Sequence, residues 1–476
     1  MTYKKFLFGS VAAAALFANP GVAQDRKPEN LLPPEPAKVT EKLPDFTKKE
    51  ATAPAPRQES VDQAFDDIKM QSGEVVQEVP SLVGDWSLAN AQKLLAFIPS
   101  VKAEGLRVAD YNADGLKAAI AAGAGPALNE VASQTFVWLV EDLRDGRTPM
   151  EARKQWFVVD PDPDRMPTHK LLESALASGD IAGTLTGLNP THPHYARLKE
   201  DLALTKDPAK RALIRANMDR WRWLGQDLGK KYLLTNVPEY QLRLTVNDKN
   251  IKTYRVVVGK PGRTATPQLA EMVEAVIFNP TWTVPQSIVK GEGLGAKVLA
   301  NPGWAKAAGY KGTKGENGWI TVVQQPGPNN SLGLMKLDMP NEHAIFLHDT
   351  PSRHLFAQDN RALSHGCIRV QGARELAMTM SMLGNAKTKA DLPVIQAEVS
   401  EITASGEYTR YPMVNQWPVY ITYFTYGVDV NDNLTRFTDI YDRDAPVLAA
   451  LDAPRQQNRA RKTNEEVVEI VDDLQT

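Results

Sequence analysis

The spacing of apolar residues changes at Lys231, and this change divides the chain into two kinds of fold. From residue 80 to 230, apolar residues recur every three or four positions, as on one face of a helix. Beyond Lys231 they alternate with polar residues and are rich in β-branched types, as in half-buried strands. We therefore predict an α+β protein, with an all-α domain at residues 79–229 and a mostly β domain at residues 230–449.

The predicted elements follow these two periods. Five tryptophans in the helical part are interpreted as core residues and not as a sugar-stacking platform, because large aromatic side chains at helical spacing are usually buried: Trp86, Trp138, Trp156, Trp221 and Trp223. Strands are predicted at residues 232–237, 241–246, 251–258, 272–278 and 344–347, with a late pair at 418–428 and 434–441.

A long segment interrupts the predicted strands. Residues 286–333 are rich in Gly, Pro, Asn and Lys, and they are too many for a plain connection. Insertions of this kind commonly form lids or binding loops. We predict a lid that carries Trp304, Tyr310 and Trp319, with a disordered surface loop as the alternative.

The two ends of the chain have compositions unlike the rest. Lys4 and Lys5 precede an apolar stretch that ends in Gly21-Val22-Ala23, which predicts an export signal at residues 1–23 cut after Ala23. An uncleaved anchor is the alternative. Residues 24–78 are rich in proline and charge and predict a disordered tether. Residues 450–476 predict a charged tail.

Charge and cysteine usage exclude several classes of function. The 55 Lys and Arg residues nearly balance the 57 Asp and Glu residues, so no basic excess favours nucleic-acid binding. The chain has one cysteine, Cys367, which excludes an intrachain disulfide and a multi-cysteine metal cluster. We predict no cofactor and no bound metal.

The surroundings of Cys367 suggest a nucleophile. It lies in Ser364-His365-Gly366-Cys367-Ile368-Arg369 and shortly precedes a predicted helix at 373–383. An imidazole and a helix start nearby favour the reactive thiolate. The alternative is a buried cysteine that acts as a small apolar residue.

A partner base is available upstream of Cys367. His348 ends a predicted strand, and a neutral imidazole can take the thiol proton and return it to a leaving amine. Asp349 can orient the ring by its side chain or carbonyl. The amides of His365, Gly366 and Cys367 are predicted to form an oxyanion hole. The chemistry indicated is acyl transfer through a thioester.

These residues match a known family. The spacing from His348 to Ser364-His365-Gly366-Cys367-Ile368-Arg369 resembles the signature of the L,D-transpeptidases, the YkuD-type cysteine enzymes of the bacterial cell wall. Further segments resemble the large periplasmic members, which carry a helical scaffold domain: Asp219-Arg220-Trp221-Arg222-Trp223-Leu224, Val256-Val257-Val258-Gly259-Lys260-Pro261, Phe278-Asn279-Pro280-Thr281-Trp282-Thr283-Val284-Pro285, Gln325-Pro326-Gly327-Pro328 and Pro418-Val419-Tyr420-Ile421-Thr422-Tyr423-Phe424.

The resemblance implies a reaction on peptidoglycan in the periplasm. Members attack the third residue of a tetrapeptide stem, release D-alanine and pass the acyl group to an amine. That amine belongs to another stem, which gives 3,3 cross-links, or to an outer-membrane protein. The resemblance also implies inhibition by carbapenem β-lactams.

The resemblance assigns roles to individual residues. Cys367 is the nucleophile and His348 the base, oriented through the Asp349 carbonyl. His365 has a supporting role. Arg369 supports the cysteine loop or binds a stem carboxylate, with a purely structural ion pair as the alternative. The further predicted substrate-binding residues are Ser364, Trp282, Tyr310 and Trp319.

Other functions remain open at this stage. The same residue pair would serve an L,D-carboxypeptidase or cysteine peptidase that hydrolyses stem peptides. A catalytically silent wall-binding scaffold is a second alternative. Zinc binding by His348, His354, His365 and Cys367 is a third, although their spacing is unusual for zinc. The peptidoglycan-binding module of many large relatives is not expected, because residues 198–219 hold only one or two helices' worth of chain.

Overall fold

The computed structural model describes residues 82–455. The predicted export signal and tether lie outside these residues, as does the tail from residue 456 onward. Among the described residues, no helix is both long enough and apolar enough to cross a bilayer.

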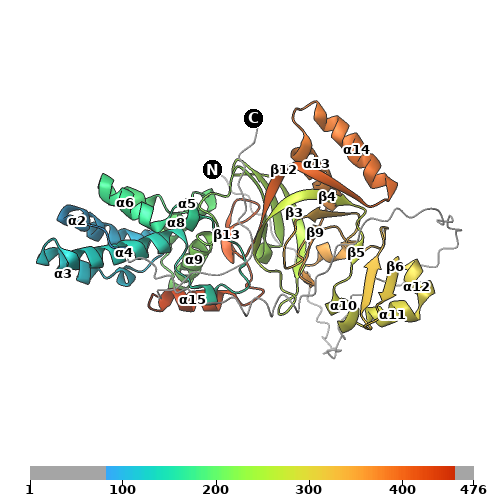
Figure 1. Ribbon diagram of the computed structural model, residues 1–476, viewed down its shortest axis with the longest axis horizontal. Coiled ribbons are helices and arrows are strands. Elements are labelled where there is room, and N and C mark those ends of the chain that lie inside the picture. The colour runs from blue at the N-terminus through green and yellow to red at the C-terminus, as the bar shows by residue number, and fades with distance from the viewer. Residues whose placement is uncertain (1–81, 456–476) are drawn as a thin grey trace, which may run out of the picture. The chain divides into compact units, whose positions relative to one another are not determined.

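Helices fill the first part of the described chain, as predicted (Figure 1). They are α2 (Leu88–Phe97), α3 (Ala113–Ala122), α4 (Pro126–Arg144), α5 (Asp162–Arg165), α6 (Thr168–Ser178), α7 (Ile181–Thr186), α8 (Pro193–Leu204) and α9 (Pro208–Trp221). Their apolar faces form two clusters, one built mainly from α2, α4, α6 and α7, the other from α8, α9 and strands of the second part. Four of the five tryptophans are 3% exposed and Trp138 is partly buried, so the interpretation as core is confirmed.

The segment at the end of α9 joins the helices to the rest of the protein. The buried carboxylate of Asp219 accepts hydrogen bonds from the amides of Arg147 and Thr148 and from the indole of Trp223, at 2.7–3.0 Å. The next residue, Arg220, donates to Asp444 at 2.7 Å. This motif, which supports the family resemblance, therefore has a structural role here.

The predicted C-terminal tail, residues 450–476, starts before the last described helix has ended. Helix α15 (Asp444–Asp452) is folded, and its Val447 and Leu451 are buried against the helical part. Arg455 lies beyond this helix and donates to the buried Asp142 at 3.2 Å. Of the predicted tail, Asp452 and Arg455 lie within the described residues, and both are paired with helices of the first part, which the composition alone does not reveal.

The second part is built around one large sheet of β1 (Lys231–Asn236), β2 (Gln241–Val246), β3 (Lys249–Gly259), β4 (Leu269–Phe278), β8 (Met335–Asp338), β9 (Leu347–His348), β10 (Ala362–Ser364), β11 (Ile368–Val370) and β12 (Thr409–Thr422). Their order is β10-β3-β11-β9-β8-β4-β12-β1-β2. Because β2 also pairs with β3, the sheet closes into a barrel. Asn247 and Asp248 connect β2 to β3 with φ of 50° and 58°, as in the turns that fit twisted hairpins.

The predicted pairing of residues 418–428 with residues 434–441 is wrong for the first part of the earlier strand. The segment from Thr409 to Thr422 is β12, which lies between β4 and β1. Only β13 (Tyr426–Val428) pairs with β14 (Leu434–Arg436). An alternating pattern identifies a strand, but it does not identify the strand's partner.

Two helices follow the cysteine motif, α13 (Ala373–Asn385) and α14 (Asp391–Ser405). Leu376, Ala377 and Met380 lie three or four residues apart on α13 and are buried against the barrel core. Gly384 lets this helix approach β12, since a Cβ there would lie 2.7 Å from the side chain of Met413. Helix α13 therefore packs against the face of the sheet that is turned away from Cys367.

Candidate active site

Two short parallel strands place Cys367 and His348 on one face of the barrel sheet. In the β9–β11 register, Ile368 lies opposite Leu347 and Arg369 lies opposite His348. Leu347 and Ile368 point into the core and are fully buried. Because side chains alternate along a strand, Cys367, Arg369 and His348 share the other face.

The imidazole of His348 is held in a defined orientation. Its Nδ1 lies 2.5 Å from the carbonyl oxygen of Asp349, and a carbonyl can only accept, so Nδ1 carries the proton. Burial, and next the charge of Arg369, lower the pKa of His348 to about 3. The ring is therefore neutral at neutral pH, with an unprotonated Nε2 that can accept a proton.

The side chain of Asp349 fixes the chain segment beside this ring. Its buried carboxylate accepts from the amide of Leu334 at 3.0 Å and pairs with Arg353 at 2.7 Å. Gly333 has φ of 62°, and a Cβ there would lie 2.4 Å from the Asp349 carboxyl. The main chain of Asp349 thus orients the imidazole, while its side chain anchors the end of the long insertion.

The loop before Cys367 is held by internal hydrogen bonds. The hydroxyl of Ser364 donates to the carbonyl of Cys367 at 2.6 Å and accepts from the amide of Gly366 at 3.1 Å. The hydroxyl of Thr266 donates to the carbonyl of Gly366 at 2.7 Å. The predicted three-amide oxyanion hole is therefore corrected. The Gly366 amide is occupied by Ser364, which leaves the amides of His365 and Cys367 as candidates.

The thiol of Cys367 does not pair with the imidazole in this structure. Among the described residues its hydrogen-bond acceptor is the carbonyl of Ala344, 3.5 Å from Sγ. Burial raises the thiol pKa more than the Phe346 backbone and the charges of Arg369 and Lys336 lower it. The expected thiolate is thus disfavoured at rest, and α13 begins six residues beyond Cys367, too far along the chain to reverse this.

Comparison with known proteins identifies the domain that carries this arrangement. The sequence model of the L,D-transpeptidase catalytic domain, YkuD, matches residues 230–394. The chain carries a YkuD L,D-transpeptidase domain. A separate scaffold-domain model matches residues 85–202, within the helical part.

Three individual proteins that are similar to this chain carry L,D-transpeptidase names. A putative L,D-transpeptidase of Haemophilus influenzae is 29% identical over 231 residues, which cover 45% of each chain. The chain thus spans less than half the length of this curated relative. Two solved mycobacterial structures are each 10% identical and cover 42% of this chain. The L,D-transpeptidase from Mycobacterium smegmatis has a TM-score of 0.21 over 60% of its chain, and L,D-transpeptidase 1 of M. tuberculosis 0.18 over 63%.

The insertion in the L,D-transpeptidase domain has a fold of its own and is not the irregular loop that was the alternative. It contains α10 (Gln286–Gly291), α11 (Leu294–Ala300), α12 (Pro302–Ala307), β6 (Tyr310–Lys314) and β7 (Ile320–Gln324), and β5 (Trp282–Thr283) lies just before it. The three strands form an antiparallel sheet in the order β5-β7-β6. Glu292, at the end of α10, lies 3.0 Å from Nε2 of His365, so the insertion contacts the cysteine loop.

The predicted substrate-binding residues are placed in different surroundings. Ser364 is buried and serves the cysteine loop itself. Tyr310 is buried and stacks on Trp304, so it belongs to the core of the insertion. Trp319 is 46% exposed beneath the ammonium of Lys290, and Trp282 is half-buried. Ser364 and Tyr310 both make contacts within their own loops, and the role of all four residues in substrate binding stays a prediction.

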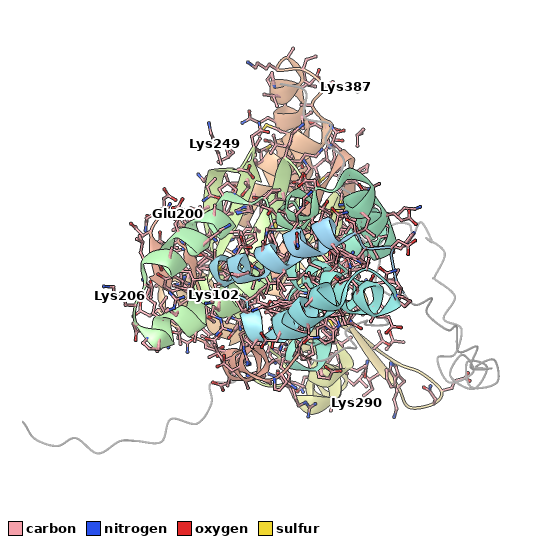
Figure 2. The ribbon with its side chains drawn as sticks, turned by 90° about the vertical axis from the view of Figure 1, so that its left-hand side faces the viewer. Lys102, Glu200, Lys206, Lys249, Lys290 and Lys387 are labelled. Carbon is pink, nitrogen blue, oxygen red and sulfur yellow. The ribbon has the colours of Figure 1, made fainter. Side chains whose placement is uncertain are left out.

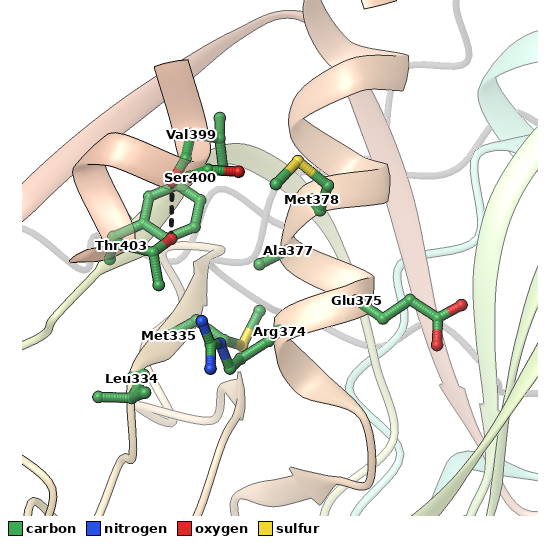
Figure 3. A pocket seen from close by; sticks show the side chains of 10 residues that line it. Leu334, Met335, Arg374, Glu375, Ala377, Met378, Val399, Ser400 and Thr403 are labelled. Carbon is green, nitrogen blue, oxygen red and sulfur yellow. Dashed lines mark hydrogen bonds between the residues drawn. The ribbon is translucent and has the colours of Figure 1, made fainter. Parts of the chain in front are cut away.

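One cavity of the L,D-transpeptidase domain lies apart from this site. It measures about 280 Å³, and Met335, Arg374, Met378 and Thr403 are among its lining residues (Figure 3). Met335 points to the α13 side of β8, whereas the next residue, Lys336, points to the side of His348. The cavity is therefore not the place where Cys367 would meet a substrate.

The sequence interpretation missed two residues of the site. Thr266 holds the cysteine loop, and no local pattern marks it. Lys336 lies directly opposite His348 in the β8–β9 pair, and the alternation Met335, Lys336, Leu337 is the signal that identifies its strand. No group of three or more potential metal ligands occurs within residues 82–455, so the geometry does not support the zinc alternative.

Proposed function

We propose that the protein is a peptidoglycan L,D-transpeptidase with Cys367 as its nucleophile. The thiol attacks the carbonyl carbon of the third residue of a tetrapeptide stem. The sulfur–carbon bond forms as the carbon–nitrogen bond breaks, and the thiol proton passes through Nε2 of His348 to the amine of the leaving D-alanine. An acceptor amine then attacks the thioester and returns the proton to sulfur.

The observation that carries this proposal is the pairing of β9 with β11. It places Cys367 and His348 on one sheet face, with Nδ1 of the ring bound to the Asp349 carbonyl. The thiol and the ring are both neutral at rest, so His348 would act as a general base during the attack. The match to the YkuD catalytic domain supports the same chemistry.

The partition between transfer and hydrolysis depends on water access to the thioester. The insertion contacts the cysteine loop through Glu292 and His365, which supports a role as a cover. We therefore favour transfer to an amine over simple hydrolysis. The acceptor is a second stem peptide or a protein, and export to the periplasm is proposed from residues 1–23.

The deciding experiment is product analysis with purified protein and tetrapeptide stems. Cross-linked dimer and free D-alanine are expected, and tripeptide alone would indicate a carboxypeptidase. Cys367→Ala and His348→Ala should abolish both products. His169→Ala removes an exposed histidine of α6 and should leave them unchanged.

A second measurement separates an enzyme from a silent wall-binding scaffold. Incubation with a carbapenem should add the mass of the drug to the wild-type protein and not to Cys367→Ala. An unmodified wild-type protein that also yields no products would favour the scaffold. N-terminal sequencing of the exported protein should begin at Gln24 if the signal is cleaved as proposed.

A further inference from the structure

Two cations flank His348 on the face of the sheet that carries Cys367. Lys336 lies opposite His348 across the β8–β9 pair, and Arg369 lies opposite His348 across the β9–β11 pair. Residues paired in this way have Cβ atoms about 5 Å apart and point to the same side. Lys336, His348 and Arg369 thus form one row across three strands.

Phe346 holds the lysine side chain close to the sheet. The ammonium of Lys336 lies 3.8 Å from the centre of the Phe346 ring. Phe346 precedes His348 by two residues and so points to the same face, and its carbonyl accepts from the amide of Ile368 at 2.9 Å. The side chain of Lys336 is 17% exposed, which places its charge at the site and not in bulk water.

The protein supplies little negative charge to either cation. The nearest carboxylate of Lys336 is Asp338, at 4.0 Å, beyond hydrogen-bond length. The other oxygen of Asp338 is bound to Arg410 at 2.7 Å. Within the described residues, Nε of Arg369 is buried without a hydrogen-bond partner. Burial lowers the pKa of both side chains, which agrees with incomplete compensation of their charges.

Such a pair is suited to an anion brought by a ligand. The proposed scissile bond joins the third residue of the stem to a terminal residue with a free carboxylate, one residue away from the attacked carbonyl. Consecutive Cα atoms are 3.8 Å apart, and Arg369 is two strand positions, about 7 Å, from Cys367. The carboxylate of the leaving residue therefore falls within reach of the row when the carbonyl is at Cys367.

We propose that Lys336, together with Arg369, binds the terminal carboxylate of the donor stem and so restricts donors to stems that end one residue after the scissile bond. Lys336 is then a specificity-determining residue for the reaction proposed above, on which this inference rests. An ammonium that served only to stabilise the Cys367 thiolate would not distinguish donors by their terminal group.

The test compares two donors, a tetrapeptide stem with a free terminal carboxylate and the same peptide with a terminal amide. A charge-assisted hydrogen bond corresponds to about a 10- to 100-fold effect. Wild-type protein should prefer the free acid by about this factor in kcat/KM, measured from the released amino acid. In Lys336→Met, kcat/KM for the free acid should fall to about the value for the amide, so that the preference is lost. Lys336→Arg should retain most of the preference.

Controls separate this role from folding and from thiol activation. Turnover of the amide donor by Lys336→Met reports that the variant is folded and active. Lys249→Met removes an exposed lysine at the β2–β3 turn and should leave the preference unchanged (Figure 2). Because the charge of Lys336 lowers the thiol pKa, the pH profile of Cys367 alkylation by iodoacetamide should move to higher pH in Lys336→Met, and this effect applies to both donors alike.

The outcomes distinguish this inference from the proposed function. Equal use of both donors by wild-type protein, or an equal loss with both donors in Lys336→Met, overturns the carboxylate site while leaving the transpeptidase proposal in place. Failure of wild-type protein to use either donor overturns the proposed function. In that case, protection of Cys367 from iodoacetamide by the free acid but not by the amide still supports the binding site, and equal protection overturns it.

Discussion

Glu292 of the insertion and His365 of the cysteine loop are in direct contact, with 3.0 Å between Oε1 and Nε2. These residues are 73 positions apart in the chain, and both side chains are partly exposed. The contact joins the insertion to the residue two positions before Cys367. It is the direct link between the proposed cover and the proposed nucleophile.

Loss of this contact should favour hydrolysis of the acyl enzyme. A partly exposed pair of this kind contributes about 0.2–1 kcal/mol, so Glu292→Ala should raise the ratio of tripeptide to cross-linked dimer by about 1.4- to fivefold. Formation of the acyl enzyme should change little. Glu316→Ala, which removes an exposed carboxylate elsewhere in the insertion, is the matched control. An unchanged product ratio in Glu292→Ala would contradict the role of the insertion as a cover.

The pH dependence of thiol alkylation should reveal a neutral resting pair. The pKa of Cys367 is raised by burial and that of His348 is lowered to about 3, so the proton stays on sulfur. The rate constant with iodoacetamide should rise by about tenfold per pH unit from pH 6 to 8, since the thiolate fraction rises by that factor below the thiol pKa. A plateau beginning near pH 5 would instead indicate a preformed thiolate–imidazolium pair. A small free thiol measured in parallel calibrates the reagent.

Ser364→Ala should weaken the cysteine loop without removing a reacting group. The buried hydroxyl bridges the Gly366 amide and the Cys367 carbonyl within the cysteine loop. Loss of such hydrogen bonds costs about 1–3 kcal/mol of stability. We expect a lower melting temperature and a lower kcat, with the KM for the stem little changed. Thr409→Ala, which removes a hydroxyl at the start of β12, serves as the control. A change confined to KM would restore the predicted role of Ser364 in substrate binding.

The sequence predicts much of this architecture because hydrophobic period and motif chemistry are local properties. Strand β2 has the predicted bounds, and α13 begins at the predicted Ala373. The partner of β12 and the burial of Tyr310 depend instead on contacts between distant segments, which one sequence does not display. The protonation state of the Cys367 thiol likewise depends on how far the folded surroundings remove water from the sulfur, which the motif does not display.

Lys336 illustrates this limit at the candidate site. Its own strand is short and carries no motif, so nothing local relates it to His348, 12 residues later. Its position follows only from the antiparallel β8–β9 register. Site residues contributed by neighbouring strands of a barrel are therefore recognised from pairing and not from spacing along the chain.

Asp219→Asn should destabilise the junction between α9 and the rest of the protein. Although burial raises the pKa of this carboxyl, the charges of Arg222 and Arg153 and two backbone amides hold it below its usual value. The ionised form is therefore stabilised in the folded state. Its contribution is present above the unfolded pKa of about 3.9 and is lost as the pH falls through the lower folded value. The variant keeps the shape of the side chain but leaves buried arginine charge uncompensated, which costs about 3 kcal/mol.

Urea unfolding at pH 7 and at pH 3 measures both parts of this prediction. The wild-type protein should be more stable than Asp219→Asn at pH 7, and the difference between the two should narrow at pH 3, because protonation removes the same charge from the wild type. Glu200→Gln, at an exposed position of α8, removes a carboxylate with little expected effect at either pH (Figure 2). Equal unfolding midpoints for Asp219→Asn and wild type at pH 7 would mean that the Asp219-Arg220-Trp221-Arg222 segment is held by its apolar contacts alone.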